Sequence, residues 1–169
     1  MRRSVRMPIV LVTYYSRTGA TKALAEVLAA SVRNAGVEVV LKPVKDVQLS
    51  ELPRYDGFLI GSPVYYGGPA AEVKRLIDLS NKYYGKLIGK AGGAFSTSAG
   101  PHGGTETTNL AIIQAMLIHG MIVQGDNAGC HYGPACVGKP NAAARKVCER
   151  YGRQFAALVR RVTGTSAQK

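Results

Sequence analysis

Three hydroxyl side chains and a glycine follow the first apolar run of the chain, and together they could bind an anion. Residues 9–12 are apolar, and Ser16–Thr21 (Ser-Arg-Thr-Gly-Ala-Thr) comes shortly after them, ahead of a helical pattern at Lys22–Ala35. Backbone N–H groups, hydroxyls and the helix dipole can converge there on a phosphate. Because the segment lacks the motifs of triphosphate and dinucleotide loops, it favours a mononucleotide monophosphate. A helix start capped by hydroxyl side chains is an equally good interpretation of this segment alone.

Two further loops, Ser62–Gly68 and Thr97–Gly104, are rich in Gly, Ser, Thr and Pro, and each comes after a predicted strand. In doubly wound sheets, ligands bind beyond the carboxyl ends of the strands, at the point where the strand order reverses. That rule selects the loops after the first, third and fourth predicted strands, which are these two loops and Ser16–Thr21. We therefore expect all three loops to form one binding site.

One histidine and a pair of cysteines are further candidates for chemistry. His119 ends a predicted helix; with an ordinary pKa of about 6.5 it could exchange a proton at neutral pH, or it could cap the helix carbonyls. Cys130 and Cys136 flank a histidine, but their separation is wider than the usual zinc spacing, so we expect no metal site. Together with Cys148 the cysteines number three. An odd number predicts a reducing compartment, and we expect the cytoplasm.

Apolar strands alternate with helical patterns along the chain, which predicts an α/β fold with a five-stranded parallel sheet covered by helices on both faces. The predicted strands are Ile9–Tyr15, Val37–Lys42, Tyr55–Gly61, Lys90–Ser96 and Met121–Gln124. The predicted helices are Lys22–Ala35, Ala70–Asn81, Thr105–His119 and a last helix after Pro140. Between Pro43 and Pro53 the pattern is weak and predicts only a short helix or turn.

Length and composition limit the possible partners. A chain of 169 residues fits one domain, and we expect it at residues 9–164, between a basic tail (1–8) and a short C-terminal tail (165–169). The net charge of +12 indicates attraction to anions. No basic motif interleaved with aromatic residues is present, so nucleic acid is an unlikely partner. No apolar run approaches the roughly 18 residues that span a membrane, so we expect no membrane insertion.

The predicted helix Thr105–His119 is apolar on more than one face. Its aliphatic side chains, Leu110, Ile113, Leu117 and Ile118 among them, cannot all point toward one sheet. A second copy of the chain is a plausible cover for the remainder. We therefore expect a homo-dimer or a homo-tetramer.

From about residue 9 to residue 164 the chain resembles the flavodoxin-like superfamily, and within it the WrbA-type NAD(P)H:quinone oxidoreductases. Ser16–Thr21 is similar to the Thr/Ser-x-Thr-Gly-x-Thr loop that wraps the FMN phosphate in flavodoxins. Gly61–Gly68 (Gly-Ser-Pro-Val-Tyr-Tyr-Gly-Gly) is similar to the Gly-Ser-Pro-Thr-Arg-Phe-Gly segment that lines the flavin ring in the WrbA-type proteins. Tyr65 stands where that family has an arginine, so a role of that arginine toward anionic substrates does not carry over.

The most specific part of the resemblance is the order of three later segments. These are Phe95–Ser98, then His102–Thr108 (His-Gly-Gly-Thr-Glu-Thr-Thr), then Ile118–Met121 (Ile-His-Gly-Met). Flavodoxin electron carriers do not normally show this second half. The family's tryptophan-containing insertion is shortened here to Lys82–Lys86, so a tyrosine of that segment would have to take over quinone stacking.

The resemblance implies a flavodoxin-like sheet with strand order 2-1-3-4-5, an FMN cofactor, and two-electron transfer from NADH or NADPH to a quinone. It implies that His119 is catalytic, near the reactive face of the ring. The implied cofactor-binding residues are Ser16, Arg17, Thr18, Gly19, Ala20, Thr21, Pro63, Val64, Tyr65, Tyr66, Gly67, Thr97, Ser98, Ala99, Gly100, Pro101, His102 and His119.

Two other functions are compatible with the same pattern. A flavodoxin-type FMN electron carrier would lack a nicotinamide site, but such carriers are typically acidic and this chain has a net charge of +12. A basic flavodoxin-fold protein that binds nucleic acid or another protein would have lost its flavin, and the intact Ser16–Thr21 loop argues against that.

Overall fold

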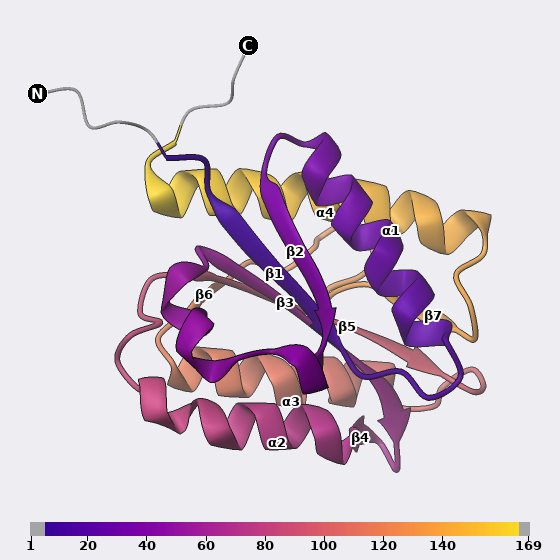
Figure 1. Cartoon of the computed structure of the whole chain (residues 1–169). Coiled ribbons are helices and arrows are strands. Elements are labelled where there is room, and N and C mark those ends of the chain that lie inside the picture. Colours follow the sequence, from indigo (N-terminus) through magenta and orange to yellow (C-terminus); the bar gives the residue numbers. More distant parts are fainter. Residues whose placement is uncertain (1–5, 166–169) are drawn as a thin grey trace, which may run out of the picture.

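A parallel sheet runs through the middle of the computed structural model, which describes residues 6–165 (Figure 1). Its strands follow the order β2-β1-β3-β5-β6, while β4 pairs with β3 and β7 pairs with β5. The strands are β1 (Ile9–Tyr14), β2 (Glu38–Pro43), β3 (Gly57–Tyr65), β4 (Gly68–Pro69), β5 (Ala91–Ser98), β6 (Ile122–Val123) and β7 (Ala135–Val137). Since β5 and β6 are the fourth and fifth predicted strands, the predicted order 2-1-3-4-5 is confirmed.

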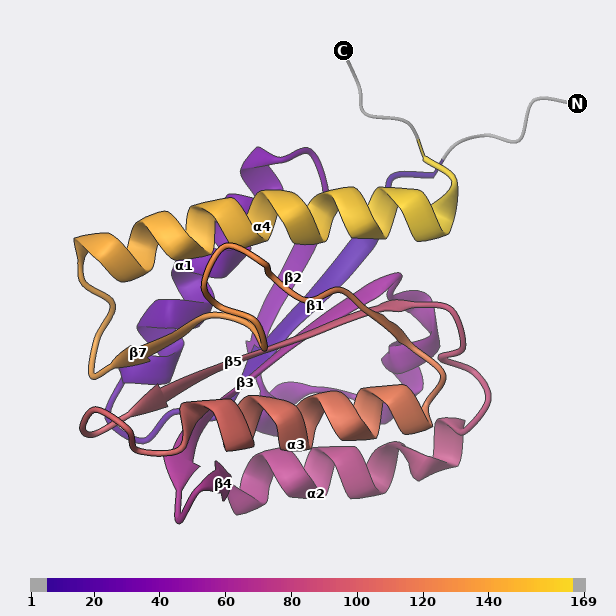
Figure 2. The same cartoon turned by 180° about the vertical axis from the view of Figure 1, so that it is seen from behind.

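Helices cover both faces of the sheet (Figures 1 and 2). On one face α1 (Ala20–Asn34) packs beside α4 (Ala142–Thr163), and on the other α2 (Ala71–Leu79) lies beside α3 (Thr105–Ile118). Short 3-10 helices fill the rest: η1 (Val44–Asp46), η2 (Leu49–Arg54) and η3 (Ser80–Tyr83). The segment between Pro43 and Pro53 thus forms no α-helix, as its weak pattern predicted.

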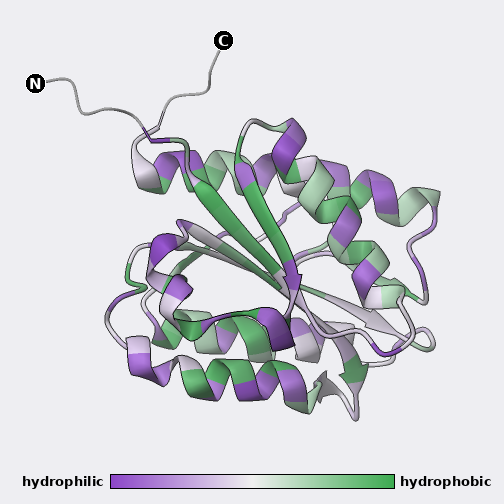
Figure 3. Ribbon diagram, in the orientation of Figure 1, coloured by the Kyte–Doolittle hydropathy of each residue, from purple (hydrophilic) through white to green (hydrophobic). Residues whose placement is uncertain are grey.

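The central strands are buried on both sides, which explains their continuous apolar runs. In β1, Val10 and Val12 join the core beneath α1 and α4, while Leu11 between them joins the core beneath α2 and α3. Figure 3 shows the result, with apolar colour along β1 and β2 and polar residues on the outer faces of the helices. Among residues 6–165, no helix combines the length and the apolarity needed to cross a membrane.

The edge strand differs from the prediction. Only Ile122 and Val123 of the predicted strand Met121–Gln124 pair with the start of β5. Residues 135–137, expected to be loop, form β7 and pair with the end of β5. The edge strand is therefore interrupted by residues 124–134. Three residues that include a cysteine and adjoin glycine carry too little β-strand pattern to reveal β7 in the sequence.

Strands β3 and β5 run further toward the predicted site than expected. Their parallel pairing continues to Pro63 opposite Thr97, and β3 then forms a hairpin with β4. The two strands approach closely because Gly61 faces the Phe95 ring, and an added Cβ there would lie 2.0 Å from a ring carbon. The first residues of two predicted loops are therefore held rigidly in the sheet.

Most of the predicted tails, residues 1–5 and 166–169, lies outside the described part of the chain. Within it, Arg6 is bound to the domain, since its guanidinium lies 2.9 Å from the Asp56 carboxylate. The same carboxylate accepts a hydrogen bond from the Ile9 N–H. Arg6, which belongs to the predicted basic tail, therefore contacts the domain, and the domain bounds 9–164 stay a prediction.

Candidate functional site

The segment Ser16–Thr21 forms a loop that ends in an uncapped helix. Gly19 precedes α1 with a left-handed backbone (φ 89°), and no side chain caps the helix. Ser16 Oγ instead accepts a hydrogen bond from the Gly19 N–H, at 3.1 Å. The idea that hydroxyl side chains simply cap this helix is therefore wrong. The first-turn N–H groups of α1 remain available to an outside anion, at the end of the helix where the dipole favours negative charge.

A buried hydroxyl pair connects this loop to the end of β5. The Oγ1 atoms of Thr21 and Thr97 lie 2.7 Å apart, and both residues are buried. One hydroxyl must donate to the other, which leaves a single hydroxyl hydrogen of the pair for a further acceptor. The pair therefore fixes the first and third predicted loops against each other.

The second and third loops also lie side by side. Thr107 Oγ1 donates a hydrogen bond of 2.7 Å to the Gly67 carbonyl, and a Cβ added to Gly104 would lie 2.9 Å from Gly67 Cα. Tyr65 of the second loop touches Tyr15 edge to face, with ring centroids 6.4 Å apart. The fold thus gathers all three loops at the carboxyl edge of the sheet.

Two non-glycine residues of these loops have strained backbones. Tyr66 has φ 49° and His102 has φ 56°. Such conformations cost energy and concentrate at ligand-binding sites. Both residues are exposed, Tyr66 completely. Tyr66 therefore offers its ring to a ligand rather than to the core.

The predicted cofactor residues at this edge differ in their exposure. Exposed are Arg17, Thr18, Tyr65, Tyr66, Gly67, Ala99, Pro101 and His102; half-buried are Ser16, Gly19, Ala20, Pro63, Val64 and Gly100; buried are Thr21, Thr97 and Ser98. The buried ones hold the loops in place, as when Ser98 Oγ donates to the Gly100 carbonyl. Direct contact with a ligand falls mainly to the exposed and half-buried groups.

His119 is not part of this group, because the structure places it away from the three loops of its own chain; its role at the flavin ring stays a prediction. Helix α3 starts at the carboxyl edge of β5 and has 14 residues, which is a rise of roughly 21 Å. His119 follows its last residue, at the opposite edge of the sheet. There its Nε2 lies 2.8 Å from Ser80 Oγ, and burial lowers its pKa. The sequence motif could not show that a helix length separates His119 from the loops of its own chain.

An acidic residue that the sequence analysis missed organises the interruption of the edge strand. Asp126 is buried and pairs with Arg150 of α4. Burial alone would raise the pKa of this carboxyl, but hydrogen bonds from the Ala128 N–H and from Arg150 hold it below its ordinary value. The loop then places the Pro134 carbonyl 3.0 Å from the Ser96 N–H. Asp126 therefore stabilises the loop that hydrogen-bonds to β5 near its end.

The three cysteines form no disulfide. Burial raises the pKa of Cys136 to about 11 and that of Cys148 to about 12, so both are thiols at neutral pH. Within residues 6–165, no cluster of three or more His, Cys, Asp or Glu side chains could hold a metal ion.

Comparison with known proteins agrees with this geometry. Residues 49–132 match the family of NADPH-dependent FMN reductases. A NAD(P)H dehydrogenase (quinone) of Sinorhizobium fredii is 36% identical over 70% of this chain and 71% of its own. A flavodoxin of Aquifex aeolicus is 36% identical over 89% of this chain and 86% of its own. The crystal structure of a WrbA-like flavodoxin from Agrobacterium tumefaciens shares the fold, with a TM-score of 0.78 at 23% identity, covering 91% of this chain and 98% of its own.

Fold and site together define a flavodoxin-like α/β protein whose loops converge at the carboxyl edge of a parallel sheet. The chain belongs to the WrbA-type family of FMN proteins within the flavodoxin-like superfamily. The residues present fit FMN, because the uncapped start of α1 offers N–H donors to a phosphate and the exposed Tyr66 offers an aromatic face beside it.

Proposed function

We propose that this protein is an FMN-dependent oxidoreductase that transfers two electrons from NADH or NADPH to a quinone. The observation that carries the proposal is the uncapped start of α1 at Gly19, facing two further loops at the same edge of the sheet. The relative from Sinorhizobium fredii, named a NAD(P)H dehydrogenase (quinone), supports this activity over other uses of the fold.

In this proposal the chain itself binds FMN and orients it. The N–H groups and hydroxyls of Ser16–Thr21 hold the phosphate of FMN, while Pro63–Gly67 and Thr97–His102 line the two sides of its ring. FMN, when bound, supplies the hydride acceptor and the two-electron donor, so few acid or base side chains are needed. Backbone N–H groups of the glycine-containing loops can approach the ring edge where negative charge develops.

The test begins with the protein freed of FMN. Titration with FMN measures binding, and the loaded protein is then mixed with NADH or NADPH and afterwards with a benzoquinone. We expect tight binding, bleaching of the flavin absorbance by the nicotinamide, and its return with the quinone. Bleaching that never occurs would overturn the enzyme function, and absence of FMN binding would leave the fold alone.

A flavodoxin-type electron carrier is the second candidate, and the flavodoxin of Aquifex aeolicus favours it. Such a carrier would bind FMN tightly without accepting a hydride from either nicotinamide. The reduction step of that test, repeated with dithionite, separates the two candidates. Dithionite would bleach the flavin in both proteins, whereas NADH or NADPH would bleach it only in the enzyme.

We also propose a homo-dimer or homo-tetramer in which the far end of α3 packs on a second copy. Leu117 and Ile118 are 57% and 71% exposed, and Tyr84 beside His119 is 66% exposed. In such an assembly His119 would serve a flavin or quinone of the neighbouring copy, since its own loops lie at the other edge. Sedimentation at micromolar concentration tests the assembly, and a monomer there would remove it.

Two further proposals concern the bounds of the domain and the cellular compartment. We place the flavin-binding domain at residues 9–164, extended to Arg6, because one sheet with two helical layers accounts for the described chain. We place the protein in the cytoplasm, because its three cysteines are unpaired thiols.

A further inference from the structure

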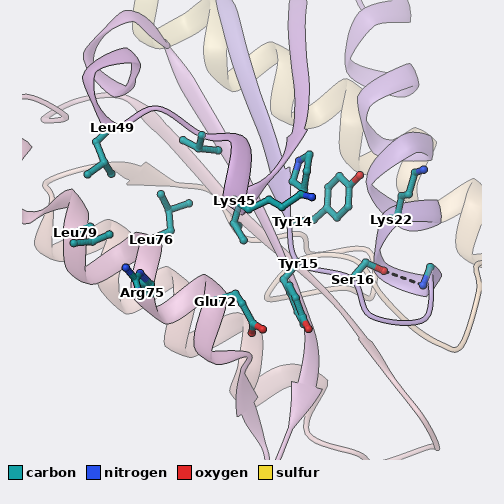
Figure 4. Close-up of a pocket in the computed structure, with 14 residues that line it drawn as sticks. Tyr14, Tyr15, Ser16, Lys22, Lys45, Leu49, Glu72, Arg75, Leu76 and Leu79 are labelled. Carbon is teal, nitrogen blue, oxygen red and sulfur yellow. Dashed lines mark hydrogen bonds between the residues drawn. The ribbon is translucent and has the colours of Figure 1, made fainter.

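A cleft of about 680 Å³ opens beside the phosphate loop, between the end of β1, η1 and α2 (Figure 4). Tyr14, Tyr15, Ser16 and Gly19 form one wall of it, at the end of β1 and the start of α1. Residues of η1 and α2 form the other walls. The cleft therefore borders the phosphate loop, while no sequence motif marks it.

The inner surface of the cleft is apolar. Val44, Val47 and Leu76 line it and belong to the core beneath α2 and α3. Tyr14 lies at the same depth, with 7% of its surface exposed. Apolar and aromatic walls of this kind suit a planar ring such as a nucleobase.

The outer surface of the cleft is cationic. Lys22 of α1, Lys45 of η1 and Arg75 of α2 line it, and all three side chains are exposed. Within residues 6–165, neither Lys45 nor Arg75 forms an ion pair, and Lys22 has only a long contact of 3.9 Å with Glu26. The rim of an apolar cleft thus carries three cations from three elements, which attract an anion with a ring attached.

One carboxylate opposes these cations. Glu72 also lines the cleft, and Figure 4 shows it pointing toward Tyr15 from the first turn of α2. A hydrogen bond from the Tyr15 hydroxyl to Glu72 is the main cause that raises the pKa of Tyr15. Because Tyr15 also touches Tyr65 of the second loop, it joins the cleft to the predicted ring site.

We propose that this cleft binds the adenosine end of the nicotinamide dinucleotide and selects NADPH over NADH. The adenine lies on the apolar surface, and Lys45 and Arg75 bind the 2′-phosphate that NADH lacks. This inference rests on the proposed function and gives it a coenzyme preference. The three loops at the carboxyl edge would position the flavin, whereas this cleft would determine which of the two coenzymes binds more tightly.

Calorimetry on the FMN-loaded and the FMN-free protein tests the cleft without any turnover. The ligands are adenosine 2′,5′-bisphosphate and adenosine 5′-monophosphate, which differ by the 2′-phosphate. We expect the bisphosphate to bind about tenfold more tightly, since two charge-assisted contacts depend on that group. Lys45→Gln with Arg75→Gln should abolish the difference, while Arg145→Gln with Lys146→Gln, the same loss of two charges at exposed positions of α4, should leave it. Equal affinities in the wild type, or a difference that survives the double variant, would overturn the inference.

Glu72→Gln provides a change of opposite sign. Removing the carboxylate takes a negative charge from the cleft, so the bisphosphate should bind several-fold more tightly. Unchanged or weaker binding in this variant would show that Glu72 does not repel the phosphate and would contradict the assigned position.

Steady-state rates then separate this inference from the proposed function. In the double variant, the KM for NADPH should rise about tenfold, while the KM for NADH and the affinity for FMN stay at their wild-type values. An active enzyme whose KM ratio for the two coenzymes does not move would overturn the cleft alone. A protein that neither nicotinamide reduces would overturn the proposed function, and the calorimetry would still decide whether the cleft binds the 2′-phosphate.

Discussion

Helices α1 and α4 pack side by side on one face of the sheet, yet they begin in opposite ways. Asn141 caps α4, its side chain accepting a hydrogen bond of 2.9 Å from the Ala144 N–H. At the start of α1 the corresponding position is Gly19, with a left-handed backbone and no side-chain cap. The start of α4 satisfies its donors within the chain, whereas the start of α1 leaves them for a ligand. The difference separates a structural helix start from a binding one.

The rest of α4 supports the same contrast. Arg150 in its middle pairs with the buried Asp126, and Arg160 near its end donates to the Ala35 carbonyl at the end of α1. Near the start of α1, two hydrogen bonds hold the loop. One joins Thr21 to Thr97, and the other runs within the loop, from the Gly19 N–H to Ser16 Oγ. Changes at α4 should therefore alter stability, and changes at the start of α1 should alter FMN binding.

The largest effect is expected from Thr18→Ala combined with Thr21→Ala. Two hydroxyls near the bound phosphate disappear, and each charge-assisted hydrogen bond contributes about 1.5–3 kcal/mol, so FMN affinity should fall at least about 100-fold. Fluorescence titration with FMN measures it. Thr163→Ala is the matched control, because it removes an exposed hydroxyl at the end of α4, outside the three loops, and should leave the FMN affinity unchanged. An affinity within a factor of three of wild type in the double variant would place the phosphate elsewhere.

Asp126→Asn should instead lower the free energy of unfolding, by about 2 kcal/mol at neutral pH, because it weakens the charge-assisted hydrogen bonds of the buried carboxylate while keeping the shape. The folded-state pKa of Asp126 lies below its ordinary value of 3.8. Its stabilising contribution is therefore present above about pH 4 and disappears as the pH falls through the lowered folded-state pKa. Urea unfolding of wild type and variant at pH 7 and below pH 3 measures the gap, which should narrow in acid. A gap independent of pH would show that the charge of Asp126 contributes nothing.

Asn141→Ala removes the cap of α4 and should cost about 1 kcal/mol of unfolding free energy, with no change in FMN affinity. Asn141→Asp is the matched control that keeps an acceptor. Urea unfolding and the FMN titration measure the two quantities on the same samples. A loss of FMN affinity without a loss of stability would reverse the roles assigned to the two helix starts.

The smallest effect is expected at the far edge of the sheet. His119→Ala should slow quinone reduction several-fold while FMN stays bound, because in the proposed assembly the imidazole would serve the site of a neighbouring copy. Burial lowers the pKa of His119, so the group is neutral at pH 7 and the effect should not depend on pH between 7 and 8. Stopped-flow reoxidation of the reduced flavin measures the rate. Wild-type rates in the variant would reduce His119 to its contact with Ser80.

Much of the fold could be predicted from the sequence because the signals are local. Four apolar residues in a row predicted a strand buried on both faces, and β1 is an interior strand that pairs with β2 and β3. The apolar spacing of the last helix predicted α4, and Gly36 and Gly164 follow the ends of α1 and α4 with left-handed backbones. The interruption of the edge strand could not be predicted, because β7 is only three residues long and is defined by its pairing with β5.

The candidate site was predictable only in part. The three loops follow from the rule that parallel strands end at one edge, so Ser16, Pro63 and Thr97 fall together without any knowledge of contacts. His119 was attached to them by a motif, although 14 residues of helix separate it from that edge. Asp126 carries no local signal, because its partner Arg150 is 24 residues away.

The sequence by itself determined the alternation of strands and helices, the hydroxyl- and glycine-rich segment Ser16–Thr21 and the excess of positive charge, since each depends on neighbouring residues or on composition. Only the tertiary structure decided which charges act together. Lys22, Lys45 and Arg75 are far apart in the chain and meet at one cleft because α1, η1 and α2 all border the end of β1. The tertiary structure also placed His119 at the other edge of the sheet. A helix has a fixed rise per residue, so α3 separates His119 from the loop at its start.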